Sequence, residues 1–207
     1  MDFNINILKN VLIELLINDS TEIFNNEREF QIALKNKLKE KFKNAGIFME
    51  CMFPLDKEIN IKNNDNVENH IDLIVYDNQK TYPIELKYKA KLIAGTDDYN
   101  IHRCNFLQDI ILTEKTIEQY NFECGYCIFL TNDEYLFTDK NETKVTKDLK
   151  ICNIDIKAGF EYKRAGKNNN LREKYLFQNS YKFRWDKIEA GVFNNFRILV
   201  VSIPKKD

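Results

Sequence analysis

The sequence lacks the short motifs by which many enzymes hold nucleotides or activate a serine. It contains no glycine-rich phosphate loop of the form G-x-x-x-x-G-K-[ST] and no nucleophile elbow of the form G-x-S-x-G. The first absence argues against ATP-driven work by this chain, and the second against a serine nucleophile of that kind. No internal repeat and no long low-complexity linker divides the chain.

The sequence also lacks a hydrophobic run of the roughly 20 residues that a membrane span needs. Its most apolar stretch, residues 7–18, is interrupted by Lys9, Asn10 and Glu14. The apolar residues there recur at helical spacing, which predicts an amphipathic helix and no membrane partner. Five cysteines, an odd number without a secretory leader, indicate a reducing compartment with free thiols. We therefore expect a cytoplasmic protein.

The chain is long and apolar enough to fold around its own core. It has 207 residues, 43% of them hydrophobic, and a net charge of −1. These values favour a single domain over residues 1–207. We expect an N-terminal helix in 1–20, a core in 22–131 and a basic, aromatic extension in 150–207.

Hydrophobic periodicity predicts an α/β (α+β) fold. Apolar residues recur at helical spacing after a capping asparagine at 25 or 26, and the segments that follow alternate as strands do. The predicted order is α-β-β-β-α-β, around a mixed sheet, and a last strand comes near the end of the chain. The predicted helices are 27–42 and 100–119, and the predicted strands are 46–53, 70–76, 82–88, 125–131 and 196–204.

Two neighbouring predicted strands carry acidic residues on one shared face. In 70–76 the odd positions are apolar, whereas in 81–89 the even positions are. An antiparallel hairpin that keeps both apolar faces together can turn at Asn78-Gln79 or at Asp77-Asn78. The first turn sets Asp72 directly opposite Glu85, and the second makes them diagonal neighbours. In both cases the two carboxylates share a face with Lys87.

Like charges that face each other across a sheet are destabilising, so something should compensate for them. A divalent cation is the economical answer, because Mg²⁺ prefers oxygen ligands and commonly takes one or two carboxylates. Glu27 offers a third carboxylate, since it begins the apolar stripe of the helix over 27–42, while Glu29 points away from that stripe. Gln31 lies one turn further on the same side.

The pattern of Glu27, Asp72 and Glu85-Leu86-Lys87 in this element order resembles the PD-(D/E)xK nuclease superfamily, which has a restriction-endonuclease-like fold. The resemblance covers about residues 22–131, and Ile71 stands where the name of the motif has proline. It implies hydrolysis of nucleic-acid phosphodiester bonds with Mg²⁺ or Mn²⁺, DNA being favoured over RNA as the substrate. It implies metal binding by Asp72, Glu85, the Leu86 carbonyl and Glu27, water handling by Lys87, and supporting positions at Gln31, Gln108 and Asp109.

The extension is a candidate nucleic-acid surface. Residues 157–187 contain nine Lys or Arg against three Asp or Glu, interleaved with aromatic residues. Cations can meet phosphates and aromatic rings can stack on unpaired bases. The competing interpretation is an ordinary strand with a solvated basic face and a packed aromatic face. The candidate binding residues are Lys163, Arg164, Lys167, Arg172, Lys174 and Arg184.

Three functional hypotheses remain at this point. The first is a metal-dependent nuclease, for which a homodimer is plausible because one site cuts one strand. The second is a catalytically silent module on the same scaffold that binds nucleic acid or protein. The third is hydrolysis of a small phosphate ester. The structural alternative for the acidic cluster is a surface hairpin with ordinary salt bridges, but Ile74 and Tyr76 share a face with Asp72, which predicts that this face is covered.

Overall fold

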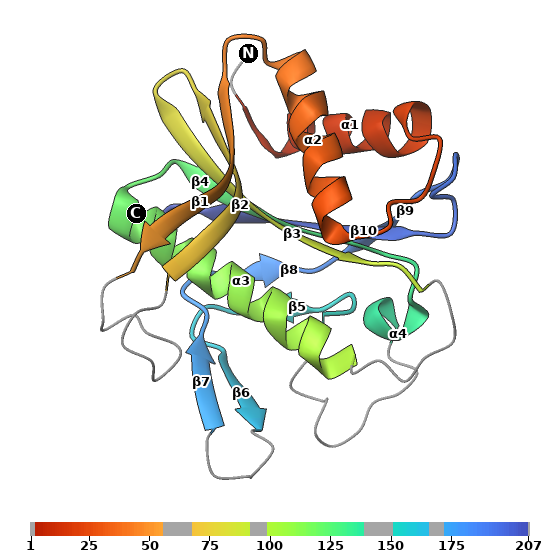
Figure 1. Ribbon diagram of the computed structural model, residues 1–207. Helices are drawn as coiled ribbons and strands as arrows, with labels where there is room; N and C mark the ends of the chain where they lie inside the picture. The colour runs from red at the N-terminus through yellow and green to blue at the C-terminus, as the bar shows by residue number, and fades with distance from the viewer. Residues whose placement is uncertain (1–2, 56–67, 92–98, 139–150, 166–171, 207) are drawn as a thin grey trace.

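The computed structural model describes residues 3–55, 68–91, 99–138, 151–165 and 172–206 (Figure 1). The fold is mixed α/β, as the sequence predicts, and it is built on a six-stranded sheet. The principal helices are α1 (Ile5–Ile13), α2 (Glu27–Lys41) and α3 (Tyr99–Tyr120), and the principal strands are β1 (Gly46–Pro54), β2 (Glu68–Asp77), β3 (Lys80–Lys89), β4 (Cys124–Thr131) and β10 (Arg197–Pro204).

The sheet has the strand order β1-β2-β3-β4-β10-β9, where β9 is the short strand Trp185–Lys187. Strands β3 and β4 are parallel because α3 carries the chain back between them, and the other neighbours are antiparallel. The sheet is therefore mixed, in agreement with the prediction. The last strand of the sequence lies inside the sheet beside β4 and leaves β1 and β9 at the edges.

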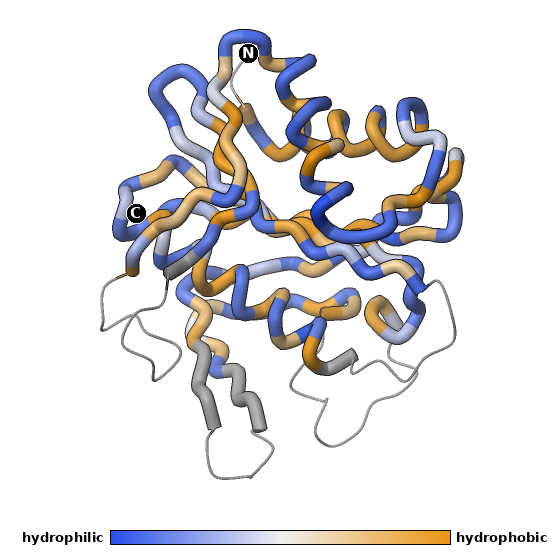
Figure 2. Tube along the Cα trace, in the orientation of Figure 1, coloured by the Kyte–Doolittle hydropathy of each residue, from blue (hydrophilic) through white to orange (hydrophobic). Residues whose placement is uncertain are grey.

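The two faces of the sheet are covered by different helices. Alternation along β3 sends Ile84 and Leu86 into a core shared with α1 and α2. The opposite face of β4, with Cys127 and Phe129, packs on α3 in a second core. Hydrophobic and hydrophilic segments alternate along α1 and α2 (Figure 2). The buried apolar residues of both helices, among them Leu8, Leu12, Phe30 and Leu34, lie in the first core.

The β2–β3 hairpin turns at Asn78-Gln79. Both residues have positive φ angles, 50° and 65°, as a two-residue type I′ turn requires. The register sets Leu73 against Ile84, and this is the first of the two turns that the sequence allowed. The ladder of paired residues ends there, one residue before the level of Asp72 and Glu85.

The N-terminal apolar stretch forms two kinds of helix. Helix α1 passes directly into a π-helix, η1 (Glu14–Asp19), where a single amphipathic helix over 7–18 was expected. The wider turn of the π-helix brings Leu15 and Leu16 into the core together. At its end the backbone carbonyls of Leu16 and Ile17 lie against Gly191, which has φ +72° and where a Cβ would sit 2.9 Å from the Ile17 oxygen.

Before β9 and β10 join the main sheet, the extension forms two pairs of short strands. Strand β6 (Glu161–Ala165) pairs with β7 (Arg172–Leu176), and β5 (Asp155–Ile156) pairs with β8 (Tyr181–Lys182). A single short helix, α4 (Glu134–Phe137), follows β4. All five cysteines are free thiols, and Cys127 is buried. In the described part of the chain no helix is long and apolar enough to cross a membrane.

Candidate active site

Strand β3 places Glu85 and Lys87 on its α3 side. Glu85 is only 6% exposed, and Lys87 is one strand period further along the same face. The Lys87 Nζ lies 3.0 Å from Asp109 Oδ2 on α3 and 3.9 Å from Glu27 Oε1 on α2. One ammonium group therefore joins the helices on the two sides of the sheet.

Asp72 meets Glu85 where the β2–β3 ladder opens. Its Oδ2 accepts a hydrogen bond of 2.7 Å from the backbone N–H of Leu86. The charge of Asp72 contributes to raising the pKa of Glu85, and the charge of Lys87 acts on both carboxyl groups in the opposite direction. The fold thus brings Asp72 and Glu85 close together, with a positive charge nearby at Lys87.

Glu27 reaches the cluster from the N-terminus of α2. Asn26 caps this helix by accepting from the backbone N–H of Glu29, which leaves Glu27 in the first turn. The Glu27 Oε2 accepts from the backbone N–H of Tyr88 at 2.9 Å. Glu29 instead turns back to Asn25, so the predicted orientation of the two glutamates is confirmed.

Gln31 links α2 to the acidic pair. Its side chain is 2% exposed, and its Nε2 donates to the backbone oxygen of Asp72 at 2.9 Å and to Asp72 Oδ1 at 3.2 Å. The same amide nitrogen donates to Glu50 Oε1 at 2.9 Å. Gln108 is also buried, on α3 beside Asp109, but within the described part of the chain it makes no hydrogen bond to this cluster.

Two residues of this network were missed by the sequence analysis. Glu50 lies opposite Asp72 in the β1–β2 register and has a φ of 52°, which is uncommon for a residue with a side chain. Its Oε1 accepts from Arg28 Nη1 at 2.7 Å, and the same guanidinium nitrogen donates to Gln31 Oε1 at 2.6 Å. A glutamate inside a strand pattern gives no sign of a positive φ, so the sequence held no signal for Glu50.

Burial raises the pKa of the acidic side chains in the cluster. The pKa of Asp72 rises to about 6, although the charge of Lys87 and the Leu86 N–H act in the opposite direction. The pKa of Glu85 is raised well above its usual value by burial and then by the charges of Asp72 and Asp109. The pKa of Glu27 is also raised, mainly by burial. Such a cluster holds protons that a cation could replace.

Lys87 is held in its charged form. Burial alone would lower its pKa, but the surrounding carboxylates, with Asp109 first among them, raise it above the usual value. A lysine with a raised pKa is a poor general base near neutral pH. The environment therefore favours orientation of a water or a phosphate by the Lys87 ammonium over removal of a proton by Lys87.

The oxygen donors fit Mg²⁺ or Mn²⁺. The described residues include no group of three His, Cys, Asp or Glu side chains arranged to hold a metal ion. Mg²⁺ needs no such trio, because it is commonly bound by one or two carboxylates, waters and substrate phosphates. Asp72 and Glu85 supply two such carboxyl groups on one face of adjacent strands, and a divalent cation would offset the repulsion between their charges.

Three aromatic residues of the basic extension are buried and therefore cannot stack on the bases of a nucleic acid. Phe177, Tyr181 and Phe183 are at most 3% exposed and pack in the second core. The Arg184 guanidinium is paired with Asp155. Strands β6 and β7 carry Lys163, Arg164, Arg172 and Lys174, and Lys167 lies outside the described residues. The packed-strand interpretation thus holds for these three aromatic residues.

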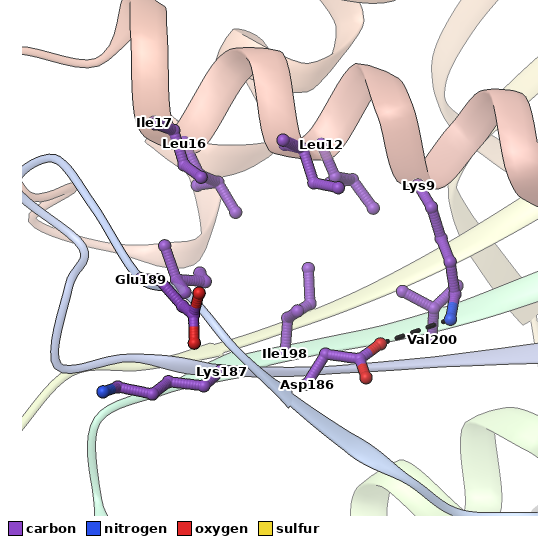
Figure 3. Close-up of a pocket in the computed structure, with 11 residues that line it drawn as sticks. Lys9, Leu12, Leu16, Ile17, Asp186, Lys187, Glu189, Ile198 and Val200 are labelled. Atoms are coloured by element: carbon purple, nitrogen blue, oxygen red, sulfur yellow. Dashed lines mark hydrogen bonds and ion pairs between the residues drawn. The ribbon is translucent and has the colours of Figure 1, made fainter.

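A separate pocket of about 270 Å³ lies between α1, η1 and the β9–β10 edge of the sheet (Figure 3). Leu12 and Leu16 point from the helix toward Ile198 on β10, and the ion pair of Lys9 with Asp186 closes one side at 3.2 Å. None of its lining residues belongs to the acidic cluster. Most of its lining residues are apolar, and the charged ones are Lys9, Asp186, Lys187 and Glu189.

No protein-family model, no curated protein and no solved structure matches this chain. The functional assignment therefore rests on the geometry of the acidic cluster itself.

Proposed function

We propose that this protein is a divalent-metal-dependent nuclease of the PD-(D/E)xK superfamily, with a restriction-endonuclease-like core and with DNA as the favoured substrate. The observation that carries the proposal is that adjacent strands place Asp72 and the buried Glu85 on one face, beside the ammonium of Lys87, which lies between Asp109 and Glu27. A surface hairpin with ordinary salt bridges would not bury Glu85 to 6% exposure.

The metal would be held by Asp72 and Glu85, with Glu27 and the Leu86 carbonyl as further oxygen donors. When bound, it would polarise the phosphoryl group and lower the pKa of a water. Gln31 and the Leu86 N–H fix the Asp72 carboxylate from two directions, so its oxygens stay in place before the substrate arrives.

Lys87 would stabilise the charge that develops on the phosphate during hydrolysis. Its Nζ is held between Asp109 and Glu27, and the Lys87 side chain as a whole is 22% exposed. A fixed ammonium beside a scissile phosphate is an electrostatic contribution that needs no covalent intermediate. Asp109 positions this ammonium rather than touching the substrate.

The test is incubation of the purified protein with circular, linear and single-stranded DNA and with RNA, in Mg²⁺, Mn²⁺ or EDTA. We expect metal-dependent cleavage that Lys87→Ala reduces at least about a hundredfold, as loss of a charge-stabilising group does elsewhere. Lys80→Ala is the matched control, because Lys80 lies on the same strand in an exposed ion pair with Glu123.

Cleavage in EDTA, or equal cleavage by the Lys87→Ala variant, would refute the proposed site. Tight binding of nucleic acid without cleavage in any divalent ion would instead favour the silent binding module.

A further inference from the structure

Strands β1 and β2 expose an apolar strip on the face that carries Asp72. Phe48 is 55% exposed, Met52 51% and Tyr76 47%. The register pairs Phe48 with Ile74 and Gly46 with Tyr76, so these side chains share a face with the even-numbered residues of β2. The prediction that this face is covered holds for Ile74, which is 5% exposed, but is wrong for Tyr76.

The Phe48 ring has a fixed support. It extends over Gly46, where an added Cβ would lie 2.8 Å from Phe48 Cε2 and 3.6 Å from the Tyr76 Cβ. The absence of a side chain at Gly46 therefore makes room for the ring on the strand. In the described part of the chain neither Phe48 nor Tyr76 contacts another aromatic ring, so both rings remain open to a ligand.

The strip begins within a short distance of the candidate active site. Glu50 on β1 and Asp72 on β2 lie at one level of the β1–β2 register. Phe48 is two residues from Glu50 along β1, and Tyr76 is four residues from Asp72 along β2. At about 3.3 Å per residue these steps correspond to roughly 7 and 13 Å along the strands. Stacked nucleotides rise about 3.4 Å each, so the strip spans a few nucleotides from the acidic pair.

The chemistry of the strip fits unpaired bases. Aromatic rings stack on bases of any sequence, but only when the base faces are not already stacked inside a duplex. Arg28, whose side chain is 53% exposed, adds a cation next to Glu50 that can meet a backbone phosphate. The strip is interrupted by this ion pair and is narrow for a stable protein interface, which buries about 800 Å² on each partner.

We propose that the β1–β2 face binds single-stranded nucleic acid, with bases stacked on Phe48 and Tyr76 and the backbone led toward Asp72 and Glu85. This inference rests on the proposed nuclease function for the direction of the strand, but the binding itself does not require cleavage. It places base recognition at the edge of the sheet and away from Phe177, Tyr181 and Phe183 of the extension, which are packed in the core.

The test measures binding in EDTA, where metal-dependent cleavage cannot occur, by fluorescence anisotropy. The probes are a labelled single-stranded oligonucleotide, the same sequence as a duplex, and an abasic strand of equal length. We expect Phe48→Ala and Tyr76→Ala each to weaken single-strand binding about tenfold, the order of one lost stacking contact. Binding of the abasic strand should be weak and unchanged by these substitutions.

Two further variants test whether weaker binding comes from a lost stacking contact or from a disturbed fold. Phe48→Trp should keep the affinity, because a larger ring still stacks. Ile32→Ala removes an exposed apolar side chain from α2, 42% exposed, and should leave binding unchanged. Circular dichroism of all variants checks the fold.

Single-strand binding that is unaltered in the Phe48→Ala/Tyr76→Ala double variant would overturn the proposal. So would a wild-type protein that binds no single strand, or a wild-type dimer that the double variant dissociates, since that result would make the face an interface between two copies. A protein that binds single strands through these rings but cleaves nothing would uphold the inference and refute the nuclease function.

Discussion

The β2–β3 hairpin and the strands of the extension share a sequence pattern but differ in which of their residues the fold buries. Both alternate charged with apolar or aromatic residues. In the hairpin the structure buries the charged member Glu85, whereas in the extension it buries the aromatic members Phe177 and Phe183 and leaves Arg184 in an exposed ion pair. Alternation shows which residues share a face, but it does not show which face another element will cover.

Helix α3 decides the outcome in both regions. Asp109 on this helix lies against Lys87 of the hairpin. One turn and a half later, Glu114 accepts from the backbone N–H groups of Gln178 and Asn179 and from the Tyr181 hydroxyl at 2.6 Å. Asp109, near the middle of the helix, faces the sheet, and Glu114, in its C-terminal half, anchors the extension. Burial of a charged side chain thus stabilises the extension at Glu114, whereas beside Lys87 it belongs to the candidate active site.

The strongest test of this contrast is removal of the charge at Asp72. Asp72→Asn keeps the size of the side chain but takes away one of the two carboxylates proposed to bind metal. We expect Mn²⁺ affinity to fall at least about tenfold, in the range found when a metal site loses a contact. Isothermal titration of wild type and variant measures the change, and an identical isotherm would exclude the paired-carboxylate site.

The structural counterpart is Glu114→Ala. Loss of this carboxylate leaves the partly buried N–H groups of Gln178 and Asn179 without their acceptor, and hydrogen bonds to a charged group contribute about 1.5–3 kcal/mol. We expect a loss of about 3 kcal/mol in the free energy of unfolding, measured with urea. Glu118→Ala is the control, because Glu118 makes an exposed hydrogen bond to the Gln178 side chain. Equal losses in both variants would contradict an anchoring role.

The pH dependence of stability, through proton binding by Asp72, gives a test with a smaller expected effect. The folded-state pKa of Asp72, about 6, lies above its usual value of 3.8. Its contribution to stability is therefore present below pH 3.8 and is lost as the pH rises through 6. Without metal, the melting temperature should fall by a few degrees between pH 5 and 7.5, and Mg²⁺ should restore it mainly at the higher pH.

The same pair of scans on Asp72→Asn provides the check. This variant should show a smaller pH dependence, and a fall equal to that of the wild type would assign the effect to other groups.

The smallest expected effect concerns the basic residues of the extension. Charge reversal at Lys163, Arg164 and Lys167 should weaken nucleic-acid binding severalfold and reduce its dependence on salt, because fewer counterions are released from phosphates. Affinities at two or more salt concentrations give this slope. Unchanged binding would mean that the extension is not a polymer platform, and would return attention to hydrolysis of a small phosphate ester.

The sequence predicted the parts of the fold that depend on local periodicity. The helix from Glu27, the three strands that follow it and the face shared by Asp72 and Glu85 all follow from residue spacing. The choice between two hairpin turns required the backbone, since both preserved the apolar face. The positive φ of Glu50 and its contact with Arg28 depend on the packing of α2 against β1, and the spacing of residues predicts neither.

The extension was harder to predict for the same reason. Its aromatic residues alternate with cations in a way that suits either a solvated binding face or a packed strand. Only the position of α3, with Glu114 holding Gln178 and Asn179, selects the packed arrangement for Phe177 and Tyr181. The decisive contacts join residues more than 60 positions apart, beyond the reach of local patterns.

The place of β10 in the sheet has a consequence for how the chain folds as it is synthesised. Strand β4 can pair with β3 as soon as α3 has formed, but its other edge waits for residues 197–204. Contacts between distant segments form slowly, because loop closure must precede them. A ribosome-bound chain would thus hold the α2–β3 half, with every proposed metal ligand, beside an open β4 edge. We expect the emerging chain to be most prone to aggregation during this interval, before its last strand closes the gap.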